Sequence, residues 1–186
     1  MVARLIGFAM ALMLMGFLFL PARMTELPEL LNLQMPIGAI FARLTMAFIV
    51  GAIIGWDREH RNKPAGLRTH ILVSLGAATF TLLAVEMATL YKGQQGMDLD
   101  PTRMLQGIVS GIGFLGAGSI IQGRGSVKGM TTAAGLWMVG GLGAVCGAGL
   151  YGLALIATLF ALCTLTLVHT LRVKIESQLD EHIDAG

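Results

Sequence analysis

An uncharged stretch of 42 residues, Met130 to Leu171, places the strongest constraint on the fold of this chain. As a single α-helix it would be about 63 Å long at 1.5 Å per residue, twice the roughly 30 Å of a bilayer's hydrocarbon core. The stretch must therefore fold back on itself, which predicts two membrane spans over about 130–148 and 151–171. The corner between them holds Gly147, Gly149 and Gly152.

Composition and the remaining hydropathy pattern agree with a membrane protein. Charged residues make up 13% of the chain and hydrophobic residues 55%, whereas a soluble domain carries about 25% charged residues. Four further apolar runs predict spans over 5–20, 37–56, 69–91 and 102–122. The sequence therefore predicts an all-α, polytopic transmembrane helix bundle of about six spans.

The first apolar run, 5–20, follows Arg4 and also resembles the hydrophobic part of a signal peptide. The segment 21–23, Pro-Ala-Arg, is a poor cleavage site, so we expect the helix to be retained. The chain then divides into an N-terminal helix with an interfacial connection (1–36), a membrane core (37–171) and a short tail (172–186). That tail is too short to form a soluble domain.

Lysine and arginine are unevenly distributed between the two sides that six spans would create. Nine fall on the side that holds both termini and three on the other. Cytoplasmic loops are enriched in these residues. We therefore expect a multi-pass protein with both termini in the cytoplasm, in contact with the lipid bilayer.

Five glycines fall within Gly107 to Gly118, without charge or proline. Three of them satisfy the dinucleotide fingerprint G-x-G-x-x-G, but that motif needs a preceding strand and a later acidic residue. Asp100-Pro101-Thr102 begins a helix instead, so no nucleotide cofactor is expected. Small residues let membrane helices approach closely, and this role is predicted for Gly51, Gly55, Gly107, Gly111, Gly113, Gly116, Gly118, Gly143 and Gly147.

Two charged side chains, Arg43 and Glu86, fall inside predicted spans. Counting from the loop that joins those spans, Arg43 is about 21 Å deep and Glu86 about 25 Å deep at 1.5 Å per residue. Ionisable residues inside a bilayer are commonly paired or functional. The matched depths predict an ion pair between them, and the alternative is that each reaches the outer interface separately.

The densest charge cluster is DREHRNKPAGLRTH, residues 57–70. One reading is a solvated cytoplasmic loop. However, Arg68 begins a helix, where a cation opposes the helix dipole, so we expect Glu59 or Asp57 to be its partner. The alternative is that Arg58, Lys63 and Arg68 bind an anion, such as a lipid phosphate. The candidate functional cluster comprises Asp57, Arg58, Glu59, Lys63, Gly66, Arg68, Thr69, Thr131, Thr132 and Trp137.

No arrangement typical of catalysis is present in the sequence. The histidines are scattered, and Cys146 and Cys163 sit in apolar runs without metal-ligand spacing. Asp98 and Asp100 alone would make a weak cation site. We expect neither an enzyme nor a resident metal or cofactor, and no nucleic-acid partner.

The chain resembles the MgtC/SapB family of bacterial inner-membrane proteins in three motifs that occur in the same order. They are GWDREHRNKPAGLRTH (55–70), VSGIGFLGAGSII (109–121) and VKGMTTAAGLW (127–137). The resemblance implies a five-helix core with a cytoplasmic C-terminus, to which the first helix is an addition. The site positions it carries over are Arg58, Glu59, Lys63, Gly66, Arg68, Thr69, Gly111, Gly113, Phe114, Gly116, Gly118, Thr132 and Trp137.

The chain also departs from the family pattern. Many members have glutamate at the position of Asp57, some have asparagine at Thr131 and cysteine at Met138, and longer members carry a soluble C-terminal domain. If the asparagine amide or the cysteine thiol is needed for activity, the resemblance supports the family's function in this chain less strongly.

The resemblance implies a role in growth at low magnesium and in bacterial survival inside phagocytes. It favours a regulatory or accessory protein that acts through membrane-protein partners, with a homodimer and the ATP synthase as candidates. The alternative is a small transporter or channel for Mg²⁺ or an anionic metabolite. Solute flux in liposomes distinguishes the two.

Overall fold

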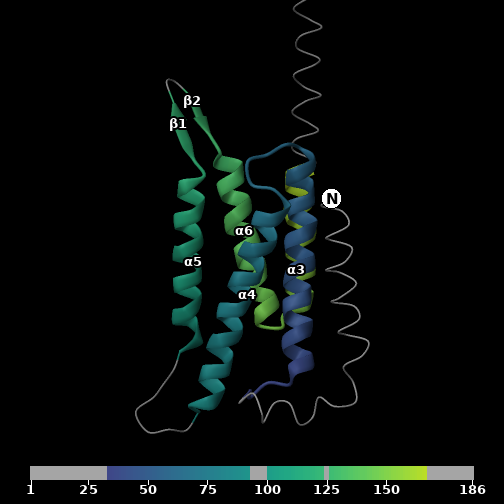
Figure 1. Cartoon of the computed structure of the whole chain (residues 1–186), viewed down its shortest axis with the longest axis vertical. Helices are drawn as coiled ribbons and strands as arrows, with labels where there is room; N and C mark the ends of the chain where they lie inside the picture. Colours follow the sequence, from purple (N-terminus) through teal and green to yellow (C-terminus); the bar gives the residue numbers. More distant parts are fainter. Residues whose placement is uncertain (1–32, 93–99, 124–125, 167–186) are drawn as a thin grey trace, which may run out of the picture.

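A computed structural model describes residues 33–92, 100–123 and 126–166 (Figure 1). The predicted first span, Asp98 and the tail 172–186 lie outside these residues. The described helices are α3 (Ile37–His60), α4 (Leu67–Leu90), α5 (Pro101–Gly118), α6 (Met130–Gly147) and a last helix, Tyr151–Thr166.

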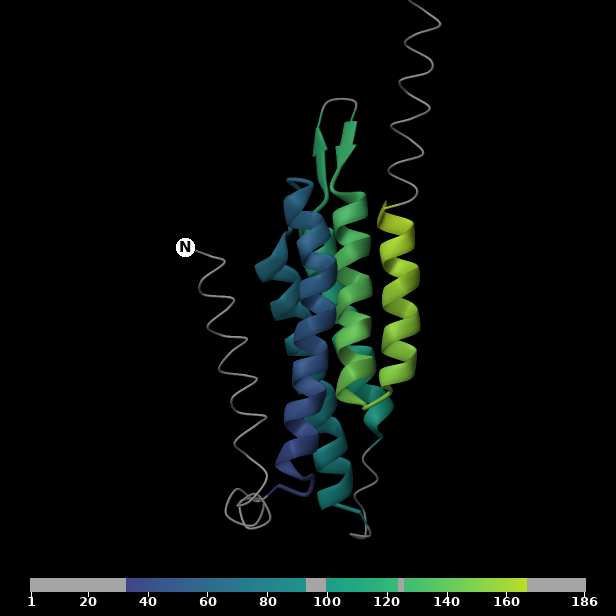
Figure 2. The same ribbon diagram turned by 90° about the vertical axis from the view of Figure 1, so that its right-hand side faces the viewer.

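The helices run up and down in a bundle (Figure 1). α3 and α4 form an antiparallel hairpin, and α6 packs against both of them. α5 lies at one edge against α4 and α6, while the last helix stands beside α6 at the other side (Figure 2). The α3–α4 loop and the start of α6 lie at one end, which we call the hairpin end because a β-hairpin projects there. We call the other end the far end.

Three of the described helices, α3, α4 and α6, are long and apolar enough to cross a membrane. The last helix is apolar but shorter, and α5 is not among the three. Arg103, Gln106 and the bare glycines of α5 reduce its apolar character. The prediction of a helical membrane protein is thus confirmed, and the number of six spans stays a prediction.

The core lies where α3, α4 and α6 meet. Ala47, Val50 and Val139 are fully or almost fully buried there. Glycines bring the backbones together: a Cβ added to Gly51 would lie 2.9 Å from the His70 carbonyl oxygen, and one added to Gly147 would lie 2.6 Å from that of Ala78. Gly55 and Gly143 face α4 in the same way.

The glycine-rich stretch of α5 behaves differently from the prediction. A Cβ added to Gly107, Gly111, Gly113 or Gly118 would meet nothing within 4 Å among the described residues. Only Gly116 approaches a neighbour, with Ala133 of α6 at 3.5 Å from the added Cβ. Close helix packing by the other four is therefore not found within the described residues, because Gly107 and Gly111 line an open groove beside α4 and the Cβ positions of Gly113 and Gly118 meet open space.

Two short strands between α5 and α6 form a β-hairpin. β1 (Ile121–Gly123) pairs antiparallel with β2 (Ser126–Lys128), and Gln122 faces Val127 across the ladder. Two β-branched residues in short alternating segments favour this structure. Gly129, at φ 95°, then turns the chain into α6, where a side chain would collide with the backbone of Ser119.

The predicted corner between α6 and the last helix is confirmed. Gly149 adopts φ 81°, a left-handed conformation that glycine adopts without steric cost. α6 ends at Gly147 and the next helix begins at Tyr151. The uncharged stretch therefore folds back within four residues.

Candidate functional site

Glu59, near the end of α3, completes the start of α4. α4 begins after Gly66, which has no side chain to cap the helix. The Glu59 carboxylate accepts a hydrogen bond from the Leu67 backbone N–H at 2.9 Å. A negative charge is favourable at a helix N-terminus. Gly66 leaves room for this contact, because an added Cβ would overlap the Glu59 carboxylate and displace it.

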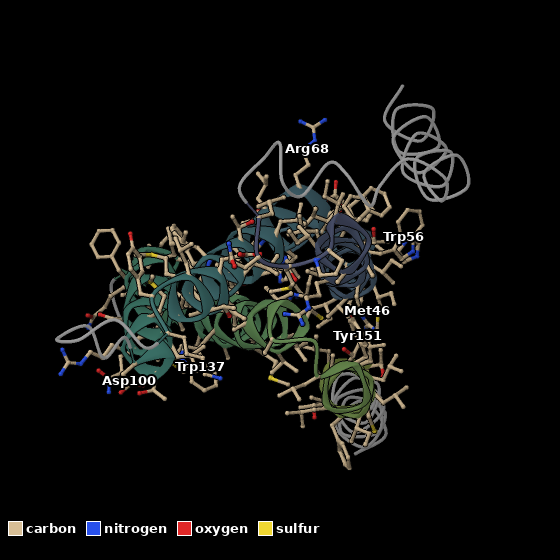
Figure 3. The ribbon with its side chains drawn as sticks, turned by 90° about the horizontal axis from the view of Figure 1, so that it is seen from below. Met46, Trp56, Arg68, Asp100, Trp137 and Tyr151 are labelled. Atoms are coloured by element: carbon tan, nitrogen blue, oxygen red, sulfur yellow. The ribbon has the colours of Figure 1, made fainter. Side chains whose placement is uncertain are left out.

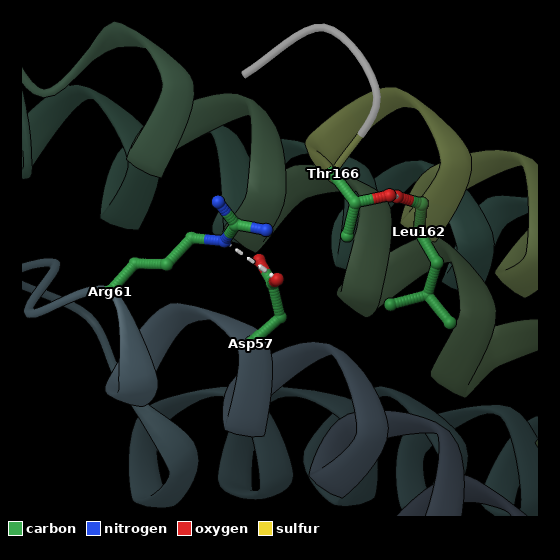
Figure 4. A network of polar contacts seen from close by, with 4 residues as sticks. All are labelled: Asp57, Arg61, Leu162 and Thr166. Atoms are coloured by element: carbon green, nitrogen blue, oxygen red, sulfur yellow. Dashed lines mark hydrogen bonds and ion pairs between the residues drawn. The ribbon is translucent and has the colours of Figure 1, made fainter. Parts of the chain in front are cut away.

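This arrangement corrects the prediction for Arg68. Asp57 pairs with Arg61 at 2.8 Å, one turn further along α3 (Figure 4). Glu59 is occupied by a backbone N–H, so neither carboxylate meets Arg68. Arg68 is exposed and points out from the bundle (Figure 3). The reason is helix geometry: Leu67 turns inward to the core, and the next side chain lies about 100° around the helix.

Arg58 links α3 to the first turn of α6. Its side chain is buried, with 3% of the residue exposed, and Nη2 donates to the hydroxyl oxygen of Thr132 at 3.2 Å. Thr132 is equally buried. Arg58 and Thr132, two members of the predicted cluster that are 74 positions apart, are therefore in contact.

His70 is fully buried between the same helices, although the sequence did not single it out. Its Nδ1 lies 2.9 Å from the Gly66 carbonyl oxygen. A carbonyl only accepts, so this nitrogen carries the proton. The missed signal was the spacing of Leu67, His70 and Ser74, which places all three on the buried face of α4.

Three buried polar atoms gather at this end without a hydrogen-bond partner among the described residues. They are Asp57 Oδ2, Arg58 Nε and His70 Nε2. A buried polar atom left unpaired costs about 1–3 kcal/mol, and such atoms are uncommon in native proteins. The hairpin end of α3, α4 and α6 is therefore the most polar part of the core and the candidate functional site.

The other predicted members of the cluster do not converge on this site. Lys63 and Thr69 are exposed, as is Trp137 on the outer surface of α6 (Figure 3). Thr131 is exposed and lines a cavity of about 310 Å³ between α3, α6 and the last helix. A second cavity, of about 530 Å³, is an apolar groove between α4 and α5.

The predicted ion pair between Arg43 and Glu86 is not formed. Arg43 donates to the Gly147 carbonyl oxygen at 2.9 Å, at the C-terminus of α6, where a cation is favourable. Glu86 accepts from the backbone N–H groups of Gln34 and Met35 at 2.9 and 2.8 Å. Glu86 thus binds the segment just before α3, eight and nine residues before Arg43 in the chain.

We predict that Glu86→Ala lowers the free energy of unfolding by about 1–3 kcal/mol, because two backbone N–H groups lose a charged acceptor. Glu86→Gln is the control, since its amide oxygen still accepts one hydrogen bond. Thermal unfolding of the purified protein in detergent measures both. Equal stability of Glu86→Ala and the unmodified chain would contradict the assignment.

Asp100 caps α5 and is not placed as a cation ligand. Its carboxylate accepts from the Thr102 backbone N–H at 2.8 Å and from the Thr102 hydroxyl at 2.7 Å. These bonds, the hydroxyl one first, hold the pKa of Asp100 below its ordinary value. Within the described residues, no group of three or more His, Cys, Asp or Glu side chains is placed to hold a metal ion.

Comparison with known proteins matches this fold and these motifs to one family. The MgtC family model matches residues 44–174. The chain is 43% identical to "Protein MgtC" of Brucella abortus over 77% of its length and 57% of the relative. It is 41% identical to "Protein SrpB" of Synechococcus elongatus, covering 67% of this chain and 71% of that protein.

The chain is also 35% identical to the Escherichia coli protein named "Putative magnesium transporter YhiD", over 72% of this chain and 62% of the relative. It therefore spans less than two thirds of the Brucella and Escherichia proteins. No solved structure matches. The family match covers more than half of the chain, including α3 from Leu44 onward and every later described element. The chain belongs to the MgtC family.

Proposed function

We propose that this chain is a regulatory or accessory protein of the bacterial inner membrane that supports adaptation to low magnesium by binding other membrane proteins. Family membership and the printed name of the YhiD relative support the link to magnesium. The hairpin end carries the exposed cations Lys63, Arg68 and Lys128, which supports a cytoplasmic position for it.

The outer face of α5 is the observation that carries this proposal. Gln106 and Ser110 are exposed there beside Gly113, which is also exposed and has nothing within 4 Å of its Cβ position. α5 stands beside α4 and α6, two helices fit to cross a membrane (Figure 1). An amide facing lipid lacks a partner, whereas polar and small residues favour contact with another membrane helix.

Substitution of this face tests the proposal. Gly113→Leu would place a large side chain on this face, and we expect growth in low magnesium to fall to that of a strain without the gene. Gly141→Leu is the matched control, because Gly141 is also exposed with nothing near its Cβ position but lies on α6. Normal growth with Gly113→Leu would contradict the proposal. Partners to test by cross-linking are a second copy of the chain and the ATP synthase.

A transporter is the second candidate, favoured by the unpaired buried atoms of Arg58 and His70. Buried ionisable groups near a membrane boundary are also found along ion pathways. A flux assay distinguishes the two functions. It uses liposomes that contain the purified protein and a magnesium indicator. The regulatory proposal predicts no flux of Mg²⁺ or anions. Flux that is lost on Arg58→Gln would favour the transporter.

A further inference from the structure

The first turn of α6 presents positive charge at the hairpin end of the bundle. α6 follows Gly129 and has no side-chain cap. The leading N–H groups of a helix have no partner inside the helix. Together they carry a partial charge of about +0.5. A group with negative charge is therefore favoured at this turn.

Arg58 adds a full positive charge at the same turn, where it is unfavourable by itself. Its Nη2 contacts Thr132, the third residue of α6, at 3.2 Å. Arg58 is 3% exposed, and its Nε is buried without a hydrogen-bond partner among the described residues. A cation buried beside a helix N-terminus is stable only when an anion accompanies it.

Each of the two nearby carboxylates binds another group through one of its oxygens. Asp57 is bound through Oδ1 by Arg61, which forms a neutral pair. Glu59 accepts the Leu67 N–H and completes α4. Among the described residues, neither carboxylate forms an ion pair with the Arg58 guanidinium, although Asp57 lies next to it in the chain.

We infer that Arg58 and the first turn of α6 bind a phosphate group, supplied either by a phospholipid headgroup or by free inorganic phosphate. A phosphate offers several acceptor oxygens, which match the planar donors of a guanidinium and the N–H groups of a helix start. α3 ends two residues after Arg58, at the limit of a predicted membrane span, where headgroups lie. This site goes beyond the proposed function and does not depend on it.

Thermal unfolding of the full chain in a phosphate-free maltoside detergent tests the site. One arm adds inorganic phosphate at constant ionic strength, and the other adds phosphatidylglycerol. The unfolding midpoint is expected to rise saturably in at least one arm, and that arm identifies the source of the phosphate. Arg58→Gln should lose the rise. Arg68→Gln, which removes an exposed cation at the same end, should keep it.

A wild-type midpoint that rises in neither arm would overturn the inference, whatever the variants do. An equal rise in Arg58→Gln and wild type would also overturn it, since binding would then be unspecific. If Arg58→Gln does not fold, Thr132→Val takes its place. The loss of the hydroxyl beside the guanidinium should raise the half-saturating concentration several-fold, and an unchanged value in that variant would count against the site.

Discussion

Gly143→Leu is expected to prevent folding of the bundle or to destabilise it by about 3 kcal/mol or more, the upper range for overpacking. An added Cβ at Gly143 would overlap the Ser74 carbonyl oxygen and lie 2.8 Å from the Ser74 Cα. The obstacle is the backbone of α4, which cannot change rotamer. The two helices would have to separate along the core.

Gly141→Leu is the control for this substitution. Gly141 lies two residues away on the same helix, is exposed and has nothing within 4 Å of its Cβ position. Both variants change helix propensity equally, so the difference between them isolates packing. Yield and unfolding midpoint in detergent are the measurements. Similar values for both variants would show that α4 and α6 are not in close contact.

The second large effect is expected from the pair Glu59 and Gly66. Glu59→Ala removes the acceptor at the start of α4, and loss of such a cap costs about 0.5–2 kcal/mol, with about 0.3–1 kcal/mol more for the charge at the helix N-terminus. Gly66→Ala should also be destabilising, because its Cβ would displace the Glu59 carboxylate. The two substitutions act on one contact.

A double-mutant cycle follows from this overlap. In the Glu59→Ala background, Gly66→Ala should have almost no further cost, since Gly66 has φ −109° and an alanine is not strained there. The coupling energy should therefore be well above the roughly 0.3–0.5 kcal/mol scatter of independent sites. Additive effects in urea or thermal unfolding would contradict the capping contact.

Sequence patterns predicted which segments form helices and where the long uncharged stretch turns, because hydropathy and glycine at a left-handed position depend on local residues. They did not distinguish Gly143, which packs against α4, from Gly111, which lines an open groove beside α4. Both have the same small-residue spacing. Which face of a helix meets a neighbour depends on the whole bundle.

Only part of the candidate site was predicted from the sequence, because its remaining contacts also depend on how the helices pack. Motif order led to Arg58, Glu59, Gly66 and Thr132, but depth counting paired Arg43 with Glu86. Counting along two helices gives relative depth only if both begin at the same level. Such counting also leaves out backbone donors and acceptors. Arg43 and Glu86 both bind backbone atoms instead of each other.

Hydrogen bonds join the helix pair α3 and α4 at both of its ends. Glu59 on α3 binds the start of α4, and Glu86 on α4 binds the backbone just before α3. No residue of α5 or α6 takes part in these hydrogen bonds. During synthesis on the ribosome, the first two core helices can thus enter the lipid as a finished pair before the next helix has been translated, and loss of either glutamate would be felt at that early stage of insertion.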